Sequence, residues 1–406
     1  MGNNHEIVLS KQLWVTQKLV FRLLSKIQYG RLSITDASGC HVFSGPSGVH
    51  THTVHIKIHG MQTYRNILFN GSVGAAESYM ESDWDVDDLI KLVEIVIKNK
   101  EIFEKIEGPI VKTINYFLRL VGTDHKNDII GAKKNSVAHY DLGNDFFKLF
   151  LDPSMMYSCA LYEPERISLE QASIKKLETI CQQLQLRPAD HILEIGTGWG
   201  GFAIYAARKH GCKVTTTTIS DKQYAYVRRE INHLGLQNRI ELLNQDYREL
   251  SGQYDKLVSI EMIEAVGHPY FDTFFQQCNA LLKPGGLLFL QAITINDQAY
   301  QRAKNKMDFI KKYIFPGGCL PSINVISNSI ANQTQLQLLQ IRDIGQHYAI
   351  TLFDWLRRFN QHAQQIKAQG FSEQFIRMWR FYLCYCAAGF RQAYISDIHA
   401  LWRKRG

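Results

Sequence analysis

Several kinds of segment are missing from this sequence, and each absence excludes a class of protein. No apolar run is long enough to span a bilayer, although 45% of the 406 residues are hydrophobic. The first stretch, MGNNHEIVLSKQ, lacks the features of a signal peptide. The eight cysteines include no C-x-x-C pair, which argues against a disulfide framework. We therefore expect a folded cytoplasmic protein with reduced thiols.

Positive charge is in moderate excess in this sequence. The net charge is +8, and basic residues gather in QRAKNKMDFIKKY and in the terminal LWRKRG. A basic face attracts any polyanion, so both a membrane of acidic lipid and an RNA are consistent with this composition. Charge alone does not decide between them.

The length predicts two or three domains, each with its own core. Residues 1–105 are predicted to form a small α+β domain. In it a helix leads into short antiparallel strands over residues 31–60, and the helices MQTYRNILFN and DVDDLIKLVEIVIKNKEIF follow, separated by GSVGAAESYMESDW. Residues 106–135 are predicted as a helix and a polar linker. The helix carries an apolar stripe that we expect to pack on another domain, with a membrane-surface role as the alternative. The larger domain spans residues 136–406.

A group of histidines in the first domain raises the question of a metal site. Strand alternation places His50 and His52 on one face and His55 and His59 on the other, so the four rings do not converge. We expect no metal there.

Four glycines within six residues form the most informative local pattern. In HILEIGTGWGGFAIYAARKHG, an apolar strand ends near Ile195 and a helix begins near Trp199, so the glycines occupy a strand-to-helix turn. Such a turn lets a ligand approach unpaired backbone N–H groups. The order E-I-G-T-G-W-G-G differs from the dinucleotide fingerprint G-x-G-x-x-G, although a Rossmann-type turn binding NAD, or binding nothing, stays open at this point.

The segments that follow narrow the choice. CKVTTTTIS and YDKLVSIEMI are predicted as further strands of one sheet, and LLKPGGLLFLQAITI is predicted as a helix end, a turn and the next strand. E-x-G-x-G followed by L-K-P-G-G resembles a class I methyltransferase, an α/β fold with a doubly wound, mostly parallel sheet that binds S-adenosylmethionine. Three aromatic-rich segments, FIKKYIFPGGCLPS, IRDIGQHYAITLFDWLRRF and FIRMWRFYLCYCAAGF, are expected to cover the carboxyl ends of the strands as a lid. An apolar lid implies an apolar substrate.

Motifs at many separated places then point to one family. HYDLGNDFF, YSCA, GTGWGG, TIS, QDYRE, YIFPGGCLPS and CAAGFR occur in that order, and together they resemble the cyclopropane fatty acid synthase family from residue 136 to about 395. GSVGAAESYMESDWD also resembles the family's small N-terminal domain. The resemblance implies transfer of a methyl group from S-adenosylmethionine to the cis double bond of a phospholipid acyl chain. It further implies peripheral contact with the inner face of a membrane and a homodimer.

The chemistry of that reaction explains the residue types. An alkene is a weak nucleophile, so the methyl donor must be a strong electrophile, and methylation leaves a carbocation on the chain. Ring closure then needs a base for a proton of the new methyl group, in a pocket that excludes water. Aromatic faces stabilise such a cation when desolvated. The rings expected to do so are those of Tyr313, Phe315, Tyr348 and Phe390.

The resemblance implies that bound bicarbonate is this base. Its expected holders are the Cys159, Glu264 and Tyr348 side chains, the backbone of Ile293, and Gln291, which stands where bacterial synthases commonly carry histidine. Glutamine donates a hydrogen bond to an anion but carries no proton charge. Cys386 is expected near the site without acting as a nucleophile. The residues expected to bind S-adenosylmethionine by the same resemblance are Tyr157, Ser158, Gly196, Gly198, Thr218, Gln223, Asp246 and Tyr247, whereas Asp221 is expected only to cap a helix.

Three alternatives remain open from the sequence. The same carbocation gives a methylene- or methyl-branched chain if a different proton is lost after a hydride shift. An RNA methyltransferase is disfavoured because the sequence holds no Pro-Pro pair for an N-P-P-Y-type loop, and we expect no nucleic acid partner. A lipid carrier without catalysis rests on Gln291 alone.

Overall fold

A computed structural model describes residues 2–46, 52–106 and 142–406, and the chain divides into two compact units. The first unit joins Met1–Asp124 to Ala363–Gln392, and the second joins His125–His362 to Ala393–Gly406. This division differs from the predicted boundaries because residues 363–392 group with the N-terminal part. The apolar stripe and linker predicted within 106–135 lie outside the described residues, apart from the end of one helix at Ile106.

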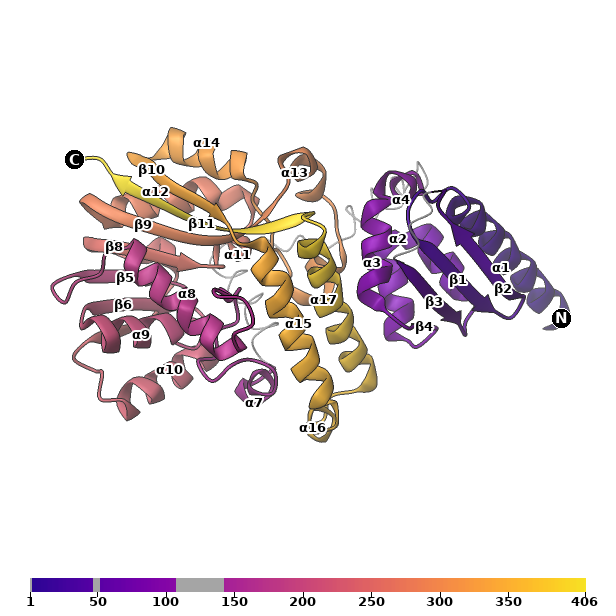
Figure 1. Cartoon of the computed structure of the whole chain (residues 1–406), viewed down its shortest axis with the longest axis horizontal. Helices are drawn as coiled ribbons and strands as arrows, with labels where there is room; N and C mark the ends of the chain where they lie inside the picture. The colour runs from indigo at the N-terminus through magenta and orange to yellow at the C-terminus, as the bar shows by residue number, and fades with distance from the viewer. Residues whose placement is uncertain (1, 47–51, 107–141) are drawn as a thin grey trace. The chain divides into compact units, whose positions relative to one another are not determined.

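The first unit contains a four-stranded sheet with the order β2-β1-β3-β4 (Figure 1). Strand β1 pairs antiparallel with β2 but parallel with β3, so the prediction of antiparallel strands is wrong for the second pair. Apolar alternation indicates a strand and its two faces but carries no information on its direction. The elements are α1 (Gly2–Leu24), β1 (Arg31–Asp36), β2 (Gly39–Ser44), β3 (Thr53–Ile58), α2 (Gln62–Met80), β4 (Trp84–Val86), α3 (Leu89–Lys98) and α4 (Lys100–Ile106).

Helix α2 continues through GSVGAAESYM, a segment that the sequence predicts as a break between helices. Gly71 adopts φ 56°, a left-handed conformation that kinks the helix. Beyond the kink, Gly74 lies against the backbone of Asn66, where an added Cβ would collide with the carbonyl oxygen. The glycines therefore serve a sharp bend and a close approach within a helix rather than a loop.

Helices α16 (Ala363–Ala368) and α17 (Glu373–Arg391) complete the first unit. The buried Arg377 of α17 donates hydrogen bonds to the carbonyls of Tyr79 and Trp84, and its guanidinium pairs with Asp85 at 2.9 Å. Near the end of α17, Arg391 pairs with the buried Glu94 of α3 at 3.2 Å. The aromatic segment predicted as part of a lid is thus anchored to α2, β4 and α3.

The second unit is built on a seven-stranded sheet with the order β10-β11-β9-β8-β5-β6-β7. Neighbouring strands from β9 to β7 run parallel, and β11 is antiparallel to both β9 and β10. This is the doubly wound, mostly parallel sheet that the sequence predicts. The strands are β5 (His191–Ile195), β6 (Lys213–Thr218), β7 (Ile240–Asn244), β8 (Tyr254–Ile260), β9 (Leu282–Ile295), β10 (Leu336–Asp343) and β11 (Ile395–Lys404).

Helices cover both faces of this sheet (Figure 1). Alternate residues of β5 enter different cores: Ile192 packs with α8, α9 and α10, whereas Leu193 packs with α12 and α14. The remaining elements are short or lie near the strand ends. The helices are α7 (Asn144–Lys148), α8 (Leu169–Gln183), α9 (Gly201–His210), α10 (Asp221–His233), η1 (Tyr247–Glu249), α11 (Ile263–Val266), η2 (His268–Tyr270), α12 (Phe271–Leu281), α13 (Asp297–Ala303), η3 (Ile310–Ile314), α14 (Ile323–Gln333) and α15 (Gly345–Gln361).

The strand order reverses at β5, which lies between β6 and β8. In open α/β sheets the crevice outside the carboxyl ends of the strands at such a reversal is the usual ligand site. The glycine turn after β5 and the acidic segment after β8 both lie there. Within the described ranges, every helix is too short or too polar to cross a lipid bilayer.

Candidate functional site

The glycine turn after β5 has the backbone that the sequence predicts. Gly196, Gly198 and Gly200 have φ values of 99°, 54° and 86°, which only glycine adopts readily. The N–H groups of Gly196 and Thr197 bond to the Thr217 carbonyl of β6 at 3.2 and 2.9 Å, which fixes the turn against the sheet. A Cβ added to Gly198 would meet nothing within 4 Å. Open space thus adjoins the turn at the position expected to face a cofactor.

The buried carboxyl group of Glu194 is connected to the glycine turn by hydrogen bonds. Glu194 of β5 accepts a hydrogen bond of 2.5 Å from the Thr216 hydroxyl, which also bonds to the Thr197 hydroxyl. Burial raises the pKa of Glu194 to about 8 because no full counter-charge replaces the lost water. The turn is therefore held by a chain of side-chain hydrogen bonds that ends at Glu194.

The ends of β6 and β7 carry four more predicted cofactor residues. Thr218 donates a hydrogen bond of 2.8 Å to Gln223, and both side chains are buried. The buried Asp246 accepts two hydrogen bonds from the Arg248 guanidinium, at 2.8 and 2.7 Å. The buried Tyr247 hydroxyl has no hydrogen-bond partner among the described residues, as expected for a group that faces a ligand.

The helix after β6 begins one residue earlier than the sequence suggested. Ser220, rather than Asp221, is the N-cap of α10, because its hydroxyl accepts from the Gln223 backbone N–H. Asp221 instead accepts a hydrogen bond of 2.8 Å from Asn244. The expectation that Asp221 caps the helix is therefore wrong, although Asp221 does lie in the first turn.

Tyr157, Ser158 and Cys159 are consecutive residues that run from the glycine turn to a buried polar cluster. The ring of Tyr157 packs against Trp199 of the turn and against Trp355, with centroids 6.5 and 5.2 Å apart. The next residue, Ser158, accepts a hydrogen bond of 2.6 Å from the buried Lys176 of α8. One short segment thus contacts both the cofactor turn and the acidic end of β8.

We define the polar cluster as Cys159, Lys176, Glu261, Glu264, Gln291, Ile293, Tyr348, Asp397 and His399. Its centre is Glu261, which directly follows β8. This carboxylate accepts hydrogen bonds from the Cys159 N–H at 2.7 Å, the Gln291 amide at 2.7 Å and the Tyr348 hydroxyl at 2.6 Å. Three separate elements therefore donate to one carboxylate.

Glu264 lies three residues further on, in α11. Its Oε1 accepts a hydrogen bond of 2.5 Å from the Ile293 N–H, and its buried Oε2 has no hydrogen-bond partner among the described residues. Burial, followed by repulsion from Glu261, raises the pKa of Glu264 to about 8. The Glu264 carbonyl also accepts from the Cys319 N–H at 2.8 Å, so the FPGGC segment is attached to the cluster.

Gln291 connects Glu261 to a third carboxyl group. The Gln291 amide donates to Asp397 of β11 at 3.0 Å and to the Cys159 carbonyl at 3.4 Å. Its carbonyl oxygen lies 3.2 Å from Nε2 of His399, which is also in β11. Burial lowers the pKa of His399 to about 3, so this imidazole is neutral. A glutamine suits this position because it donates to carboxylates while its oxygen accepts from the ring.

Acid groups outnumber bases in the cluster. Burial raises the pKa values of Glu261 and Asp397 and lowers that of Lys176, and the two carboxyl groups repel each other. Burial and the nearby carboxylates also raise the pKa of the Cys159 thiol, so this thiol stays protonated. Cys159 therefore serves through its backbone N–H rather than as a thiolate.

The structure brings together five of the six residues predicted for catalysis: Cys159, Glu264, Gln291, Ile293 and Tyr348. Cys386 lies on α17 in the first unit, so its proximity to the site stays a prediction. The same is true of the Phe390 ring. Tyr313 and Phe315 lie at η3, in the second unit with the cluster.

Sequence reasoning missed Glu261, Lys176 and Asp397. Glu261 had a signal, since IEMIE places two carboxylates at the end of one strand. Lys176 lies in SIKKLE, which is indistinguishable from an exposed helix face by its charge pattern. Asp397 reaches the site only because β11 inserts beside β9, a pairing that no local pattern predicts.

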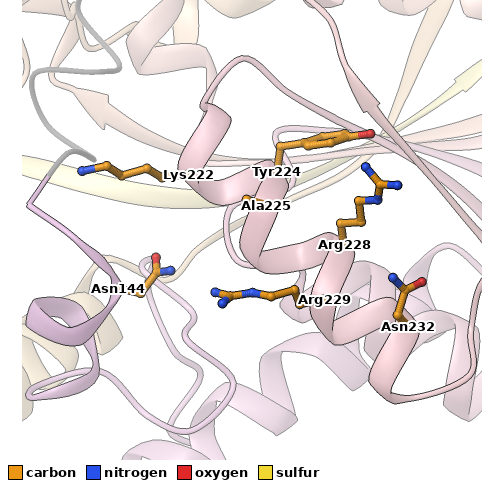
Figure 2. A pocket seen from close by; sticks show the side chains of 7 residues that line it. All are labelled: Asn144, Lys222, Tyr224, Ala225, Arg228, Arg229 and Asn232. Atoms are coloured by element: carbon orange, nitrogen blue, oxygen red, sulfur yellow. The ribbon is translucent and has the colours of Figure 1, made fainter.

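A pocket of about 520 Å³ lies outside the cluster, between α7 and α10. Figure 2 shows the Lys222, Arg228 and Arg229 side chains around it, together with Asn144. The Asn144 oxygen accepts a hydrogen bond of 2.8 Å from Trp199, which connects the pocket rim to the glycine turn. Three cations and no acidic side chain line this hollow, so it suits an anion.

Two histidines of the first unit, His52 and His59, have side chains that bond to carboxylates. His52 lies 2.9 Å from Glu94, and His59 lies 2.9 Å from Asp85. His50 lies outside the described residues. Across the described ranges, no three His, Cys, Asp or Glu side chains are grouped so that they could hold a metal ion.

Comparisons with known proteins agree on one family. The family model described as mycolic acid cyclopropane synthetase matches residues 128–400. Cyclopropane-fatty-acyl-phospholipid synthase of Escherichia coli K12 is 36% identical over 340 residues, covering 83% of this chain and 84% of that protein. Tuberculostearic acid methyltransferase UfaA1 of Mycobacterium tuberculosis is 35% identical over 339 residues, covering 82% and 79%.

Solved structures extend the likeness to the fold. Mycolic acid cyclopropane synthase CmaA1 in complex with SAH and CTAB is 31% identical, with a TM-score of 0.64, and covers 67% of this chain and 98% of that one. Coclaurine N-methyltransferase is 19% identical, with a TM-score of 0.56, and covers 78% and 99%. These structures confirm the predicted class I methyltransferase fold.

Proposed function

The chain belongs to the mycolic acid cyclopropane synthetase family, and we propose that it transfers a methylene unit from S-adenosylmethionine to the cis double bond of a phospholipid acyl chain, giving a cyclopropane ring. One observation carries the proposal: a carboxylate with three hydrogen-bond donors is bonded to Cys159, two residues after Tyr157, whose ring packs against Trp199 of the glycine turn. The place expected for a methyl donor would thus lie near a proton acceptor.

The chain's own residues fit S-adenosylmethionine at the edge of β5, β6 and β7. Gly198 leaves open space, and Tyr247 offers a buried hydroxyl without a partner in the described chain. Gly196, Gly198, Tyr157 and Ser158 would surround the methionine part, and the residues that would hold the ribose and adenine are Thr218, Gln223, Asp246 and Tyr247. When bound, the cofactor supplies an electrophilic methyl group on sulfur.

The residues beyond the turn would protect the reaction from water. Tyr348 and Trp355 lie on α15 with ring centroids 6.1 Å apart, and both are buried. Phe315 is the first residue of the FPGGC segment that bonds to Glu264, and Tyr313 lies two residues before it. The face of an aromatic ring stabilises a neighbouring carbocation by about 1–2 kcal/mol in a dry site. Their role is to keep the cation from water until a proton leaves.

Bicarbonate is the base that the family resemblance implies, and the expected holders do not present a free set of donors to it. The Cys159 N–H, Gln291 amide and Tyr348 hydroxyl donate to Glu261, and the Ile293 N–H donates to Glu264. A further anion at these groups would also meet the Glu261 carboxylate, which already accepts from three of these donors and whose charge disfavours a second anion. No step is therefore assigned to bicarbonate.

Membrane contact and a homodimer complete the proposal. The net charge of +8 and the basic pocket of Lys222, Arg228 and Arg229 support docking on anionic lipid at the inner face of the membrane. The first unit is proposed to assist docking and dimerisation. An acyl chain would then leave the bilayer and enter the second unit for reaction.

Purified protein, S-adenosylmethionine and vesicles of dioleoyl phospholipid test the function. The expected product is an acyl chain that has gained one CH2 and lost its double bond, identified as a ring by mass spectrometry with NMR. Intact cofactor binding without any transfer to the vesicles would contradict the proposal and would instead support a carrier.

The runner-up product is a methylene- or methyl-branched chain. The comparable identity to a tuberculostearic acid methyltransferase, 35%, keeps this alternative open. The same carbocation serves both reactions, so the position of the base relative to the cation decides between them. A branched chain in the vesicle assay would replace the ring assignment and keep the methyl transfer.

A further inference from the structure

Glu261 accepts hydrogen bonds from three of the residues expected to hold the anion. The Cys159 N–H and the Gln291 amide share Oε1 at 2.7 Å each, and the Tyr348 hydroxyl reaches Oε2 at 2.6 Å. Charged acceptors form shorter and stronger bonds than neutral ones, and these distances fit an ionised carboxylate. A side chain of the protein thus stands where a small anion was expected.

The backbone at Glu261 is held in an unfavourable conformation. Its φ of 47° lies in the left-handed region, which costs a non-glycine residue about 1–2 kcal/mol. The Glu261 N–H bonds to the Gln291 carbonyl at 2.8 Å, so β9 fixes this conformation. Backbone strain of this kind persists where the surroundings enforce it and is concentrated at functional sites. The strain directs the carboxylate into the cluster.

Neither neighbouring carboxyl group is placed in the same way. Glu264 accepts from the Ile293 N–H through one oxygen only, and Asp397 is completely buried in β11 behind Gln291. Glu261 and Glu264 are both partly exposed, in contrast to Asp397. Of the two accessible acids, Glu261 is the one that is oriented through both carboxylate oxygens.

We propose that Glu261 itself is the general base of the ring-closing step and replaces a bound bicarbonate, an inference that rests on the proposed function. The methyl carbon forms a bond to one alkene carbon as its bond to sulfur breaks, and the other alkene carbon becomes a cation. A C–H bond of the new methyl group then breaks, its electron pair closes the ring on the cation, and the proton passes to Glu261. The neutral Glu261 returns its proton to water after the product leaves.

The first test compares the whole protein with and without bicarbonate. Wild-type turnover of dioleoyl phospholipid vesicles, measured in buffer freed of carbon dioxide, is expected to stay within about twofold of turnover with added bicarbonate. Glu261→Gln keeps the shape of the side chain but removes the base, and kcat is expected to fall by about a hundredfold or more. Cofactor affinity by calorimetry is expected to change by less than about threefold, because Glu261 lies outside the glycine turn.

Two further variants sharpen this test. Glu178→Gln is the matched control: Glu178 accepts a hydrogen bond of 2.7 Å from Tyr205 on α9, away from the cluster, and its replacement is expected to leave turnover unchanged. Glu261→Gly relieves the left-handed backbone and empties the place of the carboxylate. Turnover by Glu261→Gly is expected to require added bicarbonate, which would then occupy the vacated donors.

The outcomes separate this inference from the proposed function. A wild-type protein that loses more than about tenfold of its turnover without bicarbonate, and regains it on addition, would overturn the role of Glu261 and leave the function intact. A Glu261→Gln variant that keeps kcat within about threefold of the wild type would overturn that role in the same way. No transfer to vesicles by the wild type under either condition would overturn the function itself, and with it the role of Glu261.

Discussion

Tyr348 shows how a single hydroxyl can set the working pH of a neighbouring acid. Its hydrogen bond of 2.6 Å stabilises the ionised form of Glu261, which opposes the upward effect of burial on the pKa of that carboxyl. Without the hydroxyl, the pKa of Glu261 rises further, and a higher pH is needed to ionise it. The hydroxyl thereby keeps a proton acceptor available.

Tyr348→Phe is therefore expected to lower kcat by about ten- to a hundredfold and to move the acidic limb of the kcat profile to higher pH. The measurement is a pH–rate profile on dioleoyl phospholipid vesicles. Tyr205→Phe is the control, since Tyr205 donates to a glutamate outside the cluster. An unshifted acidic limb in Tyr348→Phe would show that Glu261 does not limit the rate in that range.

The raised pKa of Glu194 predicts that the stability of the folded protein depends on pH. Its pKa is about 8 in the folded protein and 4.5 in its ordinary state, so the folded state holds a proton that the unfolded state has lost between these values. The free energy of unfolding therefore falls as pH rises through this window, by up to about 1.4 kcal/mol for each pH unit from this group. The stability that protonated Glu194 provides is complete below the window and lost above it.

Urea unfolding of Glu194→Gln at about pH 5.5 and about pH 8 checks this sign. The difference in the free energy of unfolding between the two conditions is expected to be smaller in the variant than in the wild type. Glu178→Gln should behave like the wild type, because its carboxyl pKa is lowered and its effect falls at more acidic pH. Equal pH dependence in Glu194→Gln and wild type would refute the raised pKa.

Local sequence predicts part of this chemistry and misses the rest for physical reasons. Cys159, Gln291, Ile293 and Tyr348 belong to separate short motifs, and the structure does bring them together. The resemblance points to Glu264 rather than Glu261 because it fixes a position in a motif but not the direction of a side chain. A positive φ turns Glu261 inward, and no composition or periodicity reveals that value.

At the scale of elements, the glycine turn depends on backbone geometry more than on side chains. Gly198 has φ 54° and open space at its Cβ position, whereas a Cβ added to Gly200 would lie 3.1 Å from Val227. Alanine at Gly198 would bring a methyl group into the space expected to hold the cofactor, in addition to backbone strain of about 1–2 kcal/mol. Alanine at Gly198 is therefore expected to have two effects, a loss of cofactor affinity and a loss of stability, which a control with the same backbone strain can separate.

Gly198→Ala is expected to weaken S-adenosylmethionine binding by about tenfold or more in calorimetry. Gly235→Ala provides the matched control: its φ of 67° and open Cβ position give similar strain, but it lies in the turn after α10, outside the glycine turn. Both variants should lose similar stability, and only the first should lose affinity. Equal affinities in the two variants would place the cofactor elsewhere.

The sheet was predictable and the pairing at its edge was not. β5, β6, β8 and β9 correspond to the predicted apolar strands, because each is a short run of apolar or β-branched residues between turns. β10 arises from LQLLQIRD, partly predicted from sequence as lid, and it pairs with the C-terminal β11. Long-range pairing of this kind depends on the whole fold rather than on local preference.

At the scale of the whole molecule, the N-terminal unit includes a segment from near the end of the sequence. Residues 363–392 belong with the N-terminal unit, where Arg377 bonds to carbonyls of Tyr79 and Trp84. A boundary near residue 105 follows from the order of the sequence, and contact between segments nearly 300 residues apart leaves no local signal. Removal of residues 1–105 would therefore strip the partner surface of α17 instead of isolating a function.

The basic pocket on α10 gives a prediction for membrane docking. Arg228→Glu combined with Arg229→Glu is expected to reduce binding to anionic vesicles and their turnover by about tenfold or more at low salt, since each basic residue near a membrane contributes about 1 kcal/mol. Cofactor affinity should remain unchanged. Charge reversal of the exposed Arg208 and Lys209, at the end of α9, provides the control. Equal losses in both double variants would point to net charge instead of this pocket.

The most direct measurement supplies S-adenosylmethionine with a fully deuterated methyl group to the protein and dioleoyl phospholipid vesicles. If a base removes a proton from the delivered methyl group and the cation closes on it, the product is a cyclopropane that keeps two of the three deuterium atoms. A product that keeps all three, or one in which the deuterated carbon is a branch rather than part of a ring, would contradict ring closure by the acid cluster at the end of β8.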